Sequence, residues 1–281
     1  FKFEQLKEEI NKKIDLIVIA VVSKGIEWAS NEISKVLKNN IPILILTKGL
    51  SINNNNLEVL AHKMERLLKK NGMKEVNISA AGGPCLAKNL ANKAHTAVVF
   101  ANNDIKIAEK ISKLVSTDYY HVSTSDDVVG VEACAAIKNI FSMAVGASQG
   151  LCDANQSKEK NYLNTAAALI QESIYEMISF VGKLKGKKET VIGLAGIGDL
   201  YVSADGGRNS KMGEYLGQGM TFQDAKKTKM PNITVEGADL ALEIGAKIKN
   251  DFDSKTLPLM ISMIDTICEE KPLKINWKNF K

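Results

Sequence analysis

The stretch that decides the fold is DLIVIAVVSKGIEWASNEISKVLKNNIPILILT, residues 15–47. Residues 15–22 are nearly all apolar and rich in β-branched side chains, which is typical of a strand buried on both faces of a parallel sheet. A segment with helical spacing follows over 25–38, and a second apolar strand follows at 42–47. A strand, a helix and a strand in this order predict a parallel sheet covered by helices.

The same alternation continues to about residue 125. Further strands are predicted at 75–80, 96–101 and 119–123, and further helices at 57–70, 85–94 and 104–115. The run NNNN at 53–56 predicts a loop before the helix at 57–70. We therefore expect an α/β domain with a doubly wound parallel sheet over residues 1–126.

The pattern changes after residue 126. Helices are predicted at 127–148, 158–185, 210–217, 221–228, 235–248 and 255–269. In this half of the chain, only VIGLA at 191–195 resembles a buried strand. The sequence thus predicts a second, all-helical domain over 127–281. Proteins of this build usually bind ligands at the carboxyl ends of strands and in clefts between domains.

Composition excludes several classes of protein. Of 281 residues, 45% are hydrophobic and 25% are charged, which excludes an intrinsically disordered chain. The net charge of +5 suits an anionic small molecule, and without a basic stripe interleaved with aromatic residues we expect no nucleic-acid partner. Four separated cysteines and three scattered histidines lack metal-ligand spacing, so no metal is expected. We find no signal peptide and no apolar run of membrane-spanning length, so no membrane span is predicted.

The basic residues are informative because only two of the 37, Arg66 and Arg208, are arginine. An arginine in this chain is therefore a candidate for a role that needs a planar guanidinium group. Arg208 ends the glycine-rich segment GLAGIGDLYVSADGGRN, 193–209, which we expect to lead into a helix near Ser210, capped by Asn209 or Ser210. Glycine amides, a helix N-terminus and Arg208 together predict a phosphate site. Arg66 lies in a charged helix face and is interpreted as solvated.

Two lysines and a glycine pair are further candidates. Lys138 lies in VVGVEACAAIKNIFSMAVG, 128–146, where apolar neighbours would desolvate its ammonium group and favour proton transfer. The alternative is a lysine whose stem follows apolar surface while its charge stays in water. Lys48 directly follows a strand in TKGL and either contacts a ligand or is a solvated loop residue. The glycines of GGPC, 82–85, either allow a ligand to approach the backbone or only form a tight turn.

In chain order, the motifs IAVVSKG, TKGL, GGPCLA, VVGVEACAAIKN, GLAGIGDL, GGRN and VEG resemble the NAD(P)-dependent glycerol-3-phosphate dehydrogenase family over about residues 14–238. The resemblance implies a Rossmann-type domain followed by an all-helical domain. It also implies an oxidoreductase that interconverts dihydroxyacetone phosphate and sn-glycerol 3-phosphate with NAD or NADP. A cytoplasmic location, a supply of glycerol phosphate for phospholipid synthesis and a homodimer are further expectations from the family.

The resemblance also assigns roles to single residues. Lys138 is expected to be the general acid and base, with Asp199 setting its charge and position. The expected substrate contacts are Lys48, Gly83, Cys85, Asn139, Ser203, Gly207, Arg208 and Asn209. The expected cofactor contacts are Ser23, Lys48, Ala87, Arg208, Thr234 and Glu236.

The sequence contains no G-x-G-x-x-G, and GIGDLY lacks the third glycine. The family carries that loop upstream of every motif matched here, and the chain starts at Phe1, so we expect an N-terminally incomplete record. One alternative is a sister dehydrogenase, such as a ketopantoate reductase or a 3-hydroxyacid dehydrogenase. The GGRN motif argues against it because those substrates lack a phosphate. Another alternative is a non-catalytic nucleotide-sensing relative.

Overall fold

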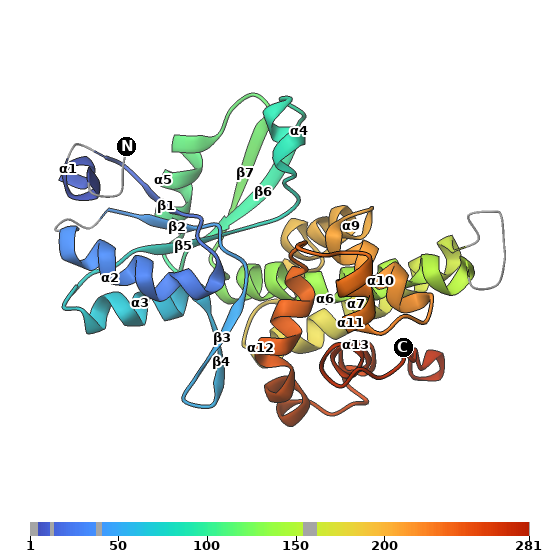
Figure 1. Cartoon of the computed structure of the whole chain (residues 1–281). Coiled ribbons are helices and arrows are strands. Elements are labelled where there is room, and N and C mark those ends of the chain that lie inside the picture. The colour runs from blue at the N-terminus through green and yellow to red at the C-terminus, as the bar shows by residue number, and fades with distance from the viewer. Residues whose placement is uncertain (1–4, 12–13, 38–40, 154–161, 281) are drawn as a thin grey trace. The chain divides into compact units, whose positions relative to one another are not determined.

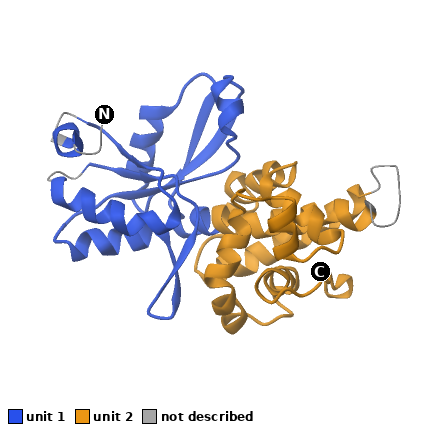
Figure 2. Ribbon diagram, in the orientation of Figure 1, with its two compact units in different colours: residues 1–133 blue, residues 134–281 orange. Residues whose placement is uncertain are grey.

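The computed structural model describes residues 5–11, 14–37, 41–153 and 162–280. It has two compact units, residues 1–133 and 134–281 (Figure 1 and Figure 2). The division falls inside helix α6 (Val128–Asp153), and our domain boundary at residue 126 stays a prediction. The two units are described in turn.

The first unit is built on a five-stranded sheet. Its strands, in order across the sheet, are β1 (Ile17–Ile19), β2 (Ile43–Ile45), β5 (Ile78–Gly82), β6 (Thr96–Ala101) and β7 (Tyr120–Ser125). The pairs β1–β2, β2–β5 and β6–β7 are parallel, whereas β5 and β6 are antiparallel. The α/β fold with a mainly parallel sheet is confirmed, and the expectation of an entirely parallel sheet is wrong at one junction.

The antiparallel junction has a local cause. A parallel connection must carry the chain back along the sheet, which takes a dozen or more residues and usually a helix. Helix α4 is only Ala87–Ala91, shorter than the predicted 85–94. Gly83, at φ 110°, turns the chain directly after β5, and a Cβ there would lie 3.1 Å from the Cα of Val98. Strand β6 therefore starts at the end of the sheet where β5 stops.

Helices cover both faces of this sheet. In Figure 1, α2 (Ile26–Val36) and α3 (Leu60–Lys70) lie on one side, and α5 (Ile105–Val115) lies on the other. A short helix, α1 (Leu6–Asn11), precedes the sheet and was not expected from the sequence. One core cluster joins strands β2 and β6 to α5 and consists of Leu44, Val98, Phe100 and Ile111.

A β-hairpin replaces the loop predicted at 53–56. Strand β3 (Leu50–Asn53) pairs antiparallel with β4 (Asn56–Val59). The turn consists of Asn54 and Asn55, at φ 47° and 61°, a region that asparagine tolerates better than most other residues. The asparagine run thus forms the hairpin's turn and flanking strand ends, and α3 begins at Leu60 instead of 57.

Arg66 braces this hairpin. Its Nε and Nη2 donate to the two carboxylate oxygens of Glu58 on β4, at 2.9 Å and 2.8 Å. The Glu58 carboxylate raises the pKa of the Arg66 guanidinium. The interpretation of Arg66 as a solvated residue is confirmed, because its side chain is exposed, and its planar fork also holds the Glu58 carboxylate through two hydrogen bonds.

The described part of the second unit contains only helices and turns, so the all-helical expectation is confirmed. Beyond α6, its α-helices are α7 (Leu163–Lys183), α8 (Lys188–Val191), α9 (Asp199–Ala204), α10 (Arg208–Gly217), α11 (Phe222–Thr228), α12 (Glu236–Asp251) and α13 (Pro258–Cys268). A π-helical turn (Leu194–Gly198) connects α8 to α9. The strand reading of 191–195 is therefore wrong.

Helix α6 crosses α10 without room for side chains. A Cβ on Gly213 would overlap the carbonyl of Met143, and a Cβ on Gly146 would overlap the backbone of Ser210. Glycines on both helices thus let the backbones of α6 and α10 pack in direct contact. The contact fixes α10 against the middle of α6.

Contrary to the sequence prediction, α6 is long and apolar enough to match a membrane-crossing helix over Val128–Cys152, with mean hydropathy 1.6. Of the window that meets these criteria, 94% is buried inside the protein. A helix that is apolar all round is either buried in a protein core or in a membrane. Here the rest of the chain covers it.

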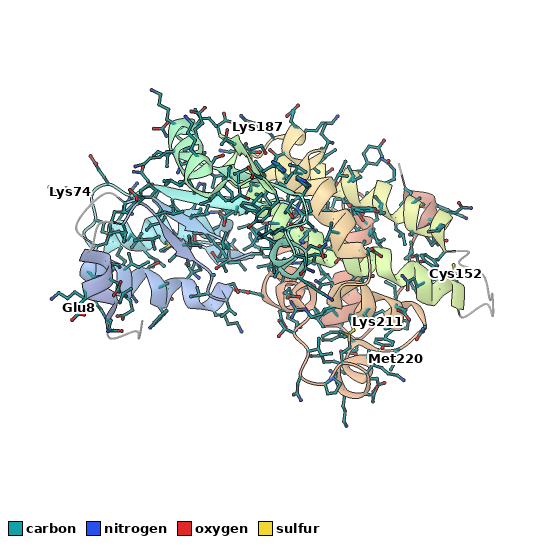
Figure 3. The ribbon with its side chains drawn as sticks, turned by 90° about the horizontal axis from the view of Figure 1, so that it is seen from above. Glu8, Lys74, Cys152, Lys187, Lys211 and Met220 are labelled. Carbon is teal, nitrogen blue, oxygen red and sulfur yellow. The ribbon has the colours of Figure 1, made fainter. Side chains whose placement is uncertain are left out.

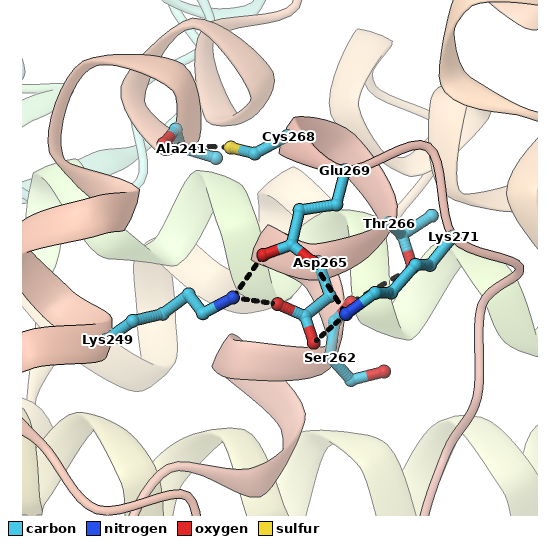
Figure 4. A network of polar contacts seen from close by, with 8 residues as sticks. All are labelled: Ala241, Lys249, Ser262, Asp265, Thr266, Cys268, Glu269 and Lys271. Carbon is cyan, nitrogen blue, oxygen red and sulfur yellow. Dashed lines mark hydrogen bonds and ion pairs between the residues drawn. The ribbon is translucent and has the colours of Figure 1, made fainter.

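Helices α12 and α13 are joined near their C-terminal ends by an exposed network of ion pairs (Figure 4). Lys249 pairs with Asp265 at 2.6 Å and also with Glu269. Lys271 pairs with Glu269 at 2.5 Å. Hydrogen bonds from Lys249 and Lys271 lower the pKa of Glu269 to about 2. Because these groups are exposed, the network orients the helix ends more than it stabilises the fold.

Candidate active site

Lys138 lies in the buried middle of α6, with 5% of its surface exposed. Its Nζ donates hydrogen bonds to Asp199 Oδ1 and Ser203 Oγ. Asp199 is 2% exposed, so the two form an ion pair inside the protein. A buried ammonium group is tolerated only when a carboxylate and hydrogen bonds replace its water. The structure thus favours the buried Lys138 over the alternative of a charge held in solvent.

The partners of Lys138 come from one face of α9. Asp199 and Ser203 are four residues apart, so their side chains project from the same side of the helix. The π-helical turn before α9 packs against α8, where a Cβ on Gly196 would overlap the backbone of Val191. The first glycine of G-x-G-D therefore allows this close contact, which lets α9 begin at Asp199.

A second polar cluster adjoins the first, because Asn139 follows Lys138 on α6. Asn209 Nδ2 donates to Asn139 Oδ1 at 3.2 Å, and Asn209 Oδ1 accepts from the backbone N–H of Gly237 at 2.9 Å. Asn209 Nδ2 also lies 3.4 Å from Glu236 Oε2. The amide of Asn209 therefore joins α6, α10 and α12 at one buried point.

The start of α10 differs from the sequence prediction. The helix begins at Arg208, with Gly207 as the N-cap and no side-chain cap. Asn209 and Ser210 are inside the first turn, and Ser210 Oγ donates to the carbonyl of Ala204. The expectation that Asn209 or Ser210 caps the helix is wrong, because both side chains are engaged by other segments.

Arg208 reaches solvent from this helix start. Its Nη2 forms an ion pair with Glu236 Oε1, and the side chains of Arg208 and Glu236 are 58% and 38% exposed. At Gly206, φ is 73° and no atom lies within 4 Å of where a Cβ would be. An exposed guanidinium, open space at the glycine turn and the N–H groups of α10 can together receive a phosphate.

The first unit places its candidate residues at one edge of the sheet. Because β1, β2 and β5 are parallel neighbours, Ser23, Lys48 and Gly83, which follow them, lie at the same carboxyl edge. A Cβ on Gly49 would lie 3.1 Å from Ser23 Cβ, so the turn beside Lys48 touches Ser23. Cys85 and Ala87 are exposed in the segment after Gly83.

Thr234 lies outside the helices of the second unit. It is exposed in the loop before α12, two residues ahead of Glu236. Lys226 Nζ donates to the carbonyls of Met230 and Ile233 in this loop and so ties it to α11. The roles of all predicted site residues stay predictions; the geometry shows which of them are neighbours.

Sequence reasoning missed Glu132. This side chain is 4% exposed, and its Oε2 accepts a hydrogen bond from the backbone N–H of Ala61 at 2.8 Å. Its Oε1 has no hydrogen-bond partner among the described residues. Burial raises the pKa of Glu132 to about 8, although the Ala61 hydrogen bond opposes part of that rise. The available signal was that Glu132 and Lys138 are the two charged residues of 128–146.

The carboxyl edge of the first unit fits part of a dinucleotide. It offers the Ser23 hydroxyl, the Lys48 ammonium group and the backbone turn at Gly83 beside parallel strand ends. The sequence has no G-x-G-x-x-G loop, so we assign no residue to the pyrophosphate. Among the residues that the structure describes, no group of three or more His, Cys, Asp or Glu side chains could hold a metal ion.

Comparisons with known proteins find similar sequences and folds over most of the chain. Family models match at residues 2–108 (NAD-dependent glycerol-3-phosphate dehydrogenase N-terminus) and 127–277 (NAD-dependent glycerol-3-phosphate dehydrogenase C-terminus). The glycerol-3-phosphate dehydrogenase [NAD(P)+] of Fusobacterium nucleatum is 32% identical over 83% of this chain and 66% of its own length. The enzyme of the same name from Pediococcus pentosaceus is 32% identical over 94% of this chain and 75% of its own length.

A solved structure is also similar. The crystal structure of glycerol-3-phosphate dehydrogenase from Coxiella burnetii superposes with a TM-score of 0.77 at 27% identity. The match covers 95% of this chain and 76% of that one. The chain therefore spans between 66% and 76% of the length of these three proteins.

Proposed function

The chain belongs to the NAD-dependent glycerol-3-phosphate dehydrogenase family, and we propose that it interconverts dihydroxyacetone phosphate and sn-glycerol 3-phosphate with NAD(H) or NADP(H). The observation that carries the proposal is the buried contact of Lys138 with Asp199 and Ser203. A proton donor is thereby held on the same helix as Asn139, whose amide contacts the helix that begins with Arg208.

Lys138 is the proton donor and acceptor in this proposal. When bound, the dinucleotide exchanges a hydride with C2 of the substrate. As the carbonyl oxygen gains negative charge, the Lys138 ammonium group stabilises it and donates a proton; in the reverse direction the amine takes that proton back. Asp199 holds the positive charge on Lys138, and Ser203 fixes the direction of Nζ.

The phosphate of the substrate is the handle that positions its reacting carbon. Arg208 receives it with a planar pair of N–H groups, and the backbone at Gly207 contributes a further donor. The hydrogen bond from Asn209 to Asn139 holds the start of α10 against α6. In this proposal, a phosphate oxygen takes the place of Glu236 Oε2, which lies 3.4 Å from Asn209 Nδ2. Lys48, Gly83 and Cys85 complete the substrate contacts carried over from the family.

The remaining assignments rest on family membership. Ser23, Ala87, Thr234 and Glu236 contact the cofactor in this proposal, and Lys48 and Arg208 reach both ligands. The enzyme acts as a homodimer in the cytoplasm and supplies glycerol phosphate for phospholipid synthesis. Dimerisation is tested by the molar mass of the purified protein in solution.

The reaction is tested by following oxidation of NADH and of NADPH with dihydroxyacetone phosphate, using the longest natural form of the protein. Ketopantoate, which has no phosphate, is the competing substrate. Turnover with dihydroxyacetone phosphate in the wild type supports the proposal and also reveals the preferred cofactor. Turnover with ketopantoate alone would overturn it in favour of a sister dehydrogenase.

A further inference from the structure

Glu132 is a buried carboxyl group that the proposed reaction does not use. It lies in the early turns of α6, within the first unit, and contacts the beginning of α3. Its Oε2 accepts from the N–H of Ala61 at 2.8 Å, and its Oε1 has no partner among the described residues. A buried polar atom without a partner is uncommon enough in folded proteins to need an explanation.

The contact matters because α3 has no cap of its own. The first four N–H groups of a helix lack partners within the helix, and a Ser, Thr, Asp or Asn at the N-cap usually accepts from one of them. The N-cap of α3 is Val59, which has no side-chain acceptor. Glu132 supplies the missing acceptor from another helix, and Ala61 is too buried for water to replace it.

The beginning of α3 in turn touches the turn that contains Lys48. Leu60, the first residue of α3, is buried, and its Cδ1 lies 3.4 Å from where a Cβ on Gly49 would be. On its other side, Gly49 is similarly close to Ser23. Leu50 and Val59 are paired across the hairpin, so the Lys48 turn and the start of α3 are the two neighbouring ends of one hairpin.

We propose that Glu132 is a positioning residue for Lys48: its carboxyl group fixes the start of α3, which fixes Gly49 and with it the backbone of Lys48. The proposal rests on the proposed function, in which Lys48 contacts the substrate. Glutamine has the shape of a neutral glutamic acid and can accept from Ala61 in the same way. Methionine fills the space but accepts no comparable hydrogen bond.

Glu176 provides a matched control. It is also a buried carboxyl group that caps a helix from a distance, because it accepts from the N–H groups of Leu259 and Met260 at the start of α13. It lies on α7 in the second unit, and Leu259 and Met260, which it caps, are not predicted site residues. Glu176→Met therefore also removes a buried carboxyl group that caps a helix, but at the start of α13 instead of near the Lys48 turn.

The first test is steady-state kinetics of the full chain with dihydroxyacetone phosphate. We expect Glu132→Met to raise KM about tenfold to hundredfold, with kcat within about threefold of wild type, because a displaced binding group weakens substrate positioning. Glu132→Gln should restore the wild-type KM, and Glu176→Met should leave KM unchanged. An equal rise in KM for Glu132→Met and Glu176→Met would show general destabilisation and overturn the proposal.

The second test does not depend on the reaction. Hydrogen exchange of the backbone at 47–50 should be faster in Glu132→Met than in wild type, Glu132→Gln and Glu176→Met. Absent wild-type turnover would count against the proposed function, while exchange would still decide the positioning role. Unchanged exchange at 47–50 in Glu132→Met would overturn that role. Should the methionine variants fail to fold, Glu132→Asp, which is too short to reach Ala61, and Glu176→Asp make the same comparison.

Discussion

Lys138 and Asp199 each depend on the other, because both are nearly inaccessible to water. Removing one partner leaves an uncompensated charge in the interior, which destabilises the protein as well as the site. A test of catalysis at Lys138 must therefore also neutralise Asp199. The ion pair thus determines how the lysine can be studied.

The double variant Lys138→Met with Asp199→Asn should lower kcat by about a hundredfold to ten-thousandfold, the range lost with a general acid or base. Affinity for the dinucleotide, measured by fluorescence titration, should stay within about threefold because neither residue is a predicted cofactor contact. Lys211→Met is the control, since Lys211 is a partly exposed lysine that pairs with Glu214 on α10. Near-normal kcat in the double variant would refute the role of Lys138.

Arg208→Ala should raise KM for dihydroxyacetone phosphate by about tenfold to a hundredfold, since a hydrogen bond to a charged group contributes roughly 1.5–3 kcal/mol. Steady-state kinetics at saturating cofactor measures this. Lys35→Ala is the control, because it removes an exposed cation that pairs with Glu32 on α2, and it should leave KM unchanged. A KM that is equal in the two variants would exclude Arg208 as the phosphate ligand.

Several features of the candidate site could be predicted because their chemistry is visible in the sequence. Lys138 stands out as a charge in an apolar helix, and Arg208 as a rare arginine after glycines. The bridging amide of Asn209 could not be predicted, because its partners depend on where α12 lies against α6. Glu132 was visible as a charge, but its role depends on a partner 71 residues away.

At the scale of elements, the stability contributed by Glu132 should depend on pH. The pKa of this carboxyl is raised in the folded protein from an ordinary 4.5 to about 8. Between these values the folded state binds more protons than the unfolded state, so the stabilisation is complete below about pH 4.5 and is lost as pH rises through about 8.

Glu132→Gln has no proton to lose at this position, so its melting temperature should exceed that of wild type by more at pH 9 than at pH 5. Thermal unfolding followed by circular dichroism at the two pH values measures the difference. A difference between the two proteins that is the same at both pH values would contradict the raised pKa. Comparing the two proteins at the same pH cancels the change in melting temperature that every other titrating group causes in both of them.

The crossing of α6 and α10 should tolerate no additional carbon atom. Gly213→Ala would force a methyl group into the carbonyl of Met143, so we expect a loss of about 2–4 kcal/mol in the free energy of unfolding. Gly182, in α7, has open space where a Cβ would be, so Gly182→Ala should stabilise by up to about 1 kcal/mol. Chemical denaturation of the two variants gives both values, and a loss of equal size at Gly182 would exclude the packing argument.

The pattern of apolar residues along the sequence predicted the elements that are buried as that pattern requires, such as the strands near 42–47 and 96–101. It failed where a tertiary contact decides the backbone. Helix α9 was hidden by the glycines before it, of which Gly196 contacts the backbone of Val191. The hairpin was hidden by asparagines that accept a left-handed conformation. The direction of β6 depends on a short connection and could not be read from its apolar residues.

At the scale of the whole molecule, the net charge is +5, and basic and acidic residues are interspersed along the chain. Lysines such as Lys74, Lys187 and Lys211 project from different parts of it (Figure 3). Such a surplus attracts anions over a distance comparable to the Debye length, which is about 10 Å at 0.1 M salt. The surface therefore favours encounters with a phosphate substrate without determining which one is bound.

Raising sodium chloride from about 50 mM to about 500 mM should increase KM for dihydroxyacetone phosphate by about threefold to tenfold, because salt screens both the surface and the exposed Arg208. The buried Lys138 is screened less, so kcat at saturating substrate and cofactor should change little. Dihydroxyacetone, which has no phosphate, is the control and should show no comparable effect. A KM that does not respond to salt would exclude an electrostatic contribution to substrate binding.

The apolar character of α6 has a consequence for how the protein is made. The ribosome completes α6 at residue 153, whereas the glycines that pack against it, Gly213 and Gly237, are added 60 or more residues later. At about 5–20 residues per second, that interval lasts several seconds. During this time the nascent chain presents a helix with the composition of a membrane span, before the glycines that pack against its middle have been added. We therefore expect α6 to be a segment to which a chaperone binds as the chain leaves the ribosome.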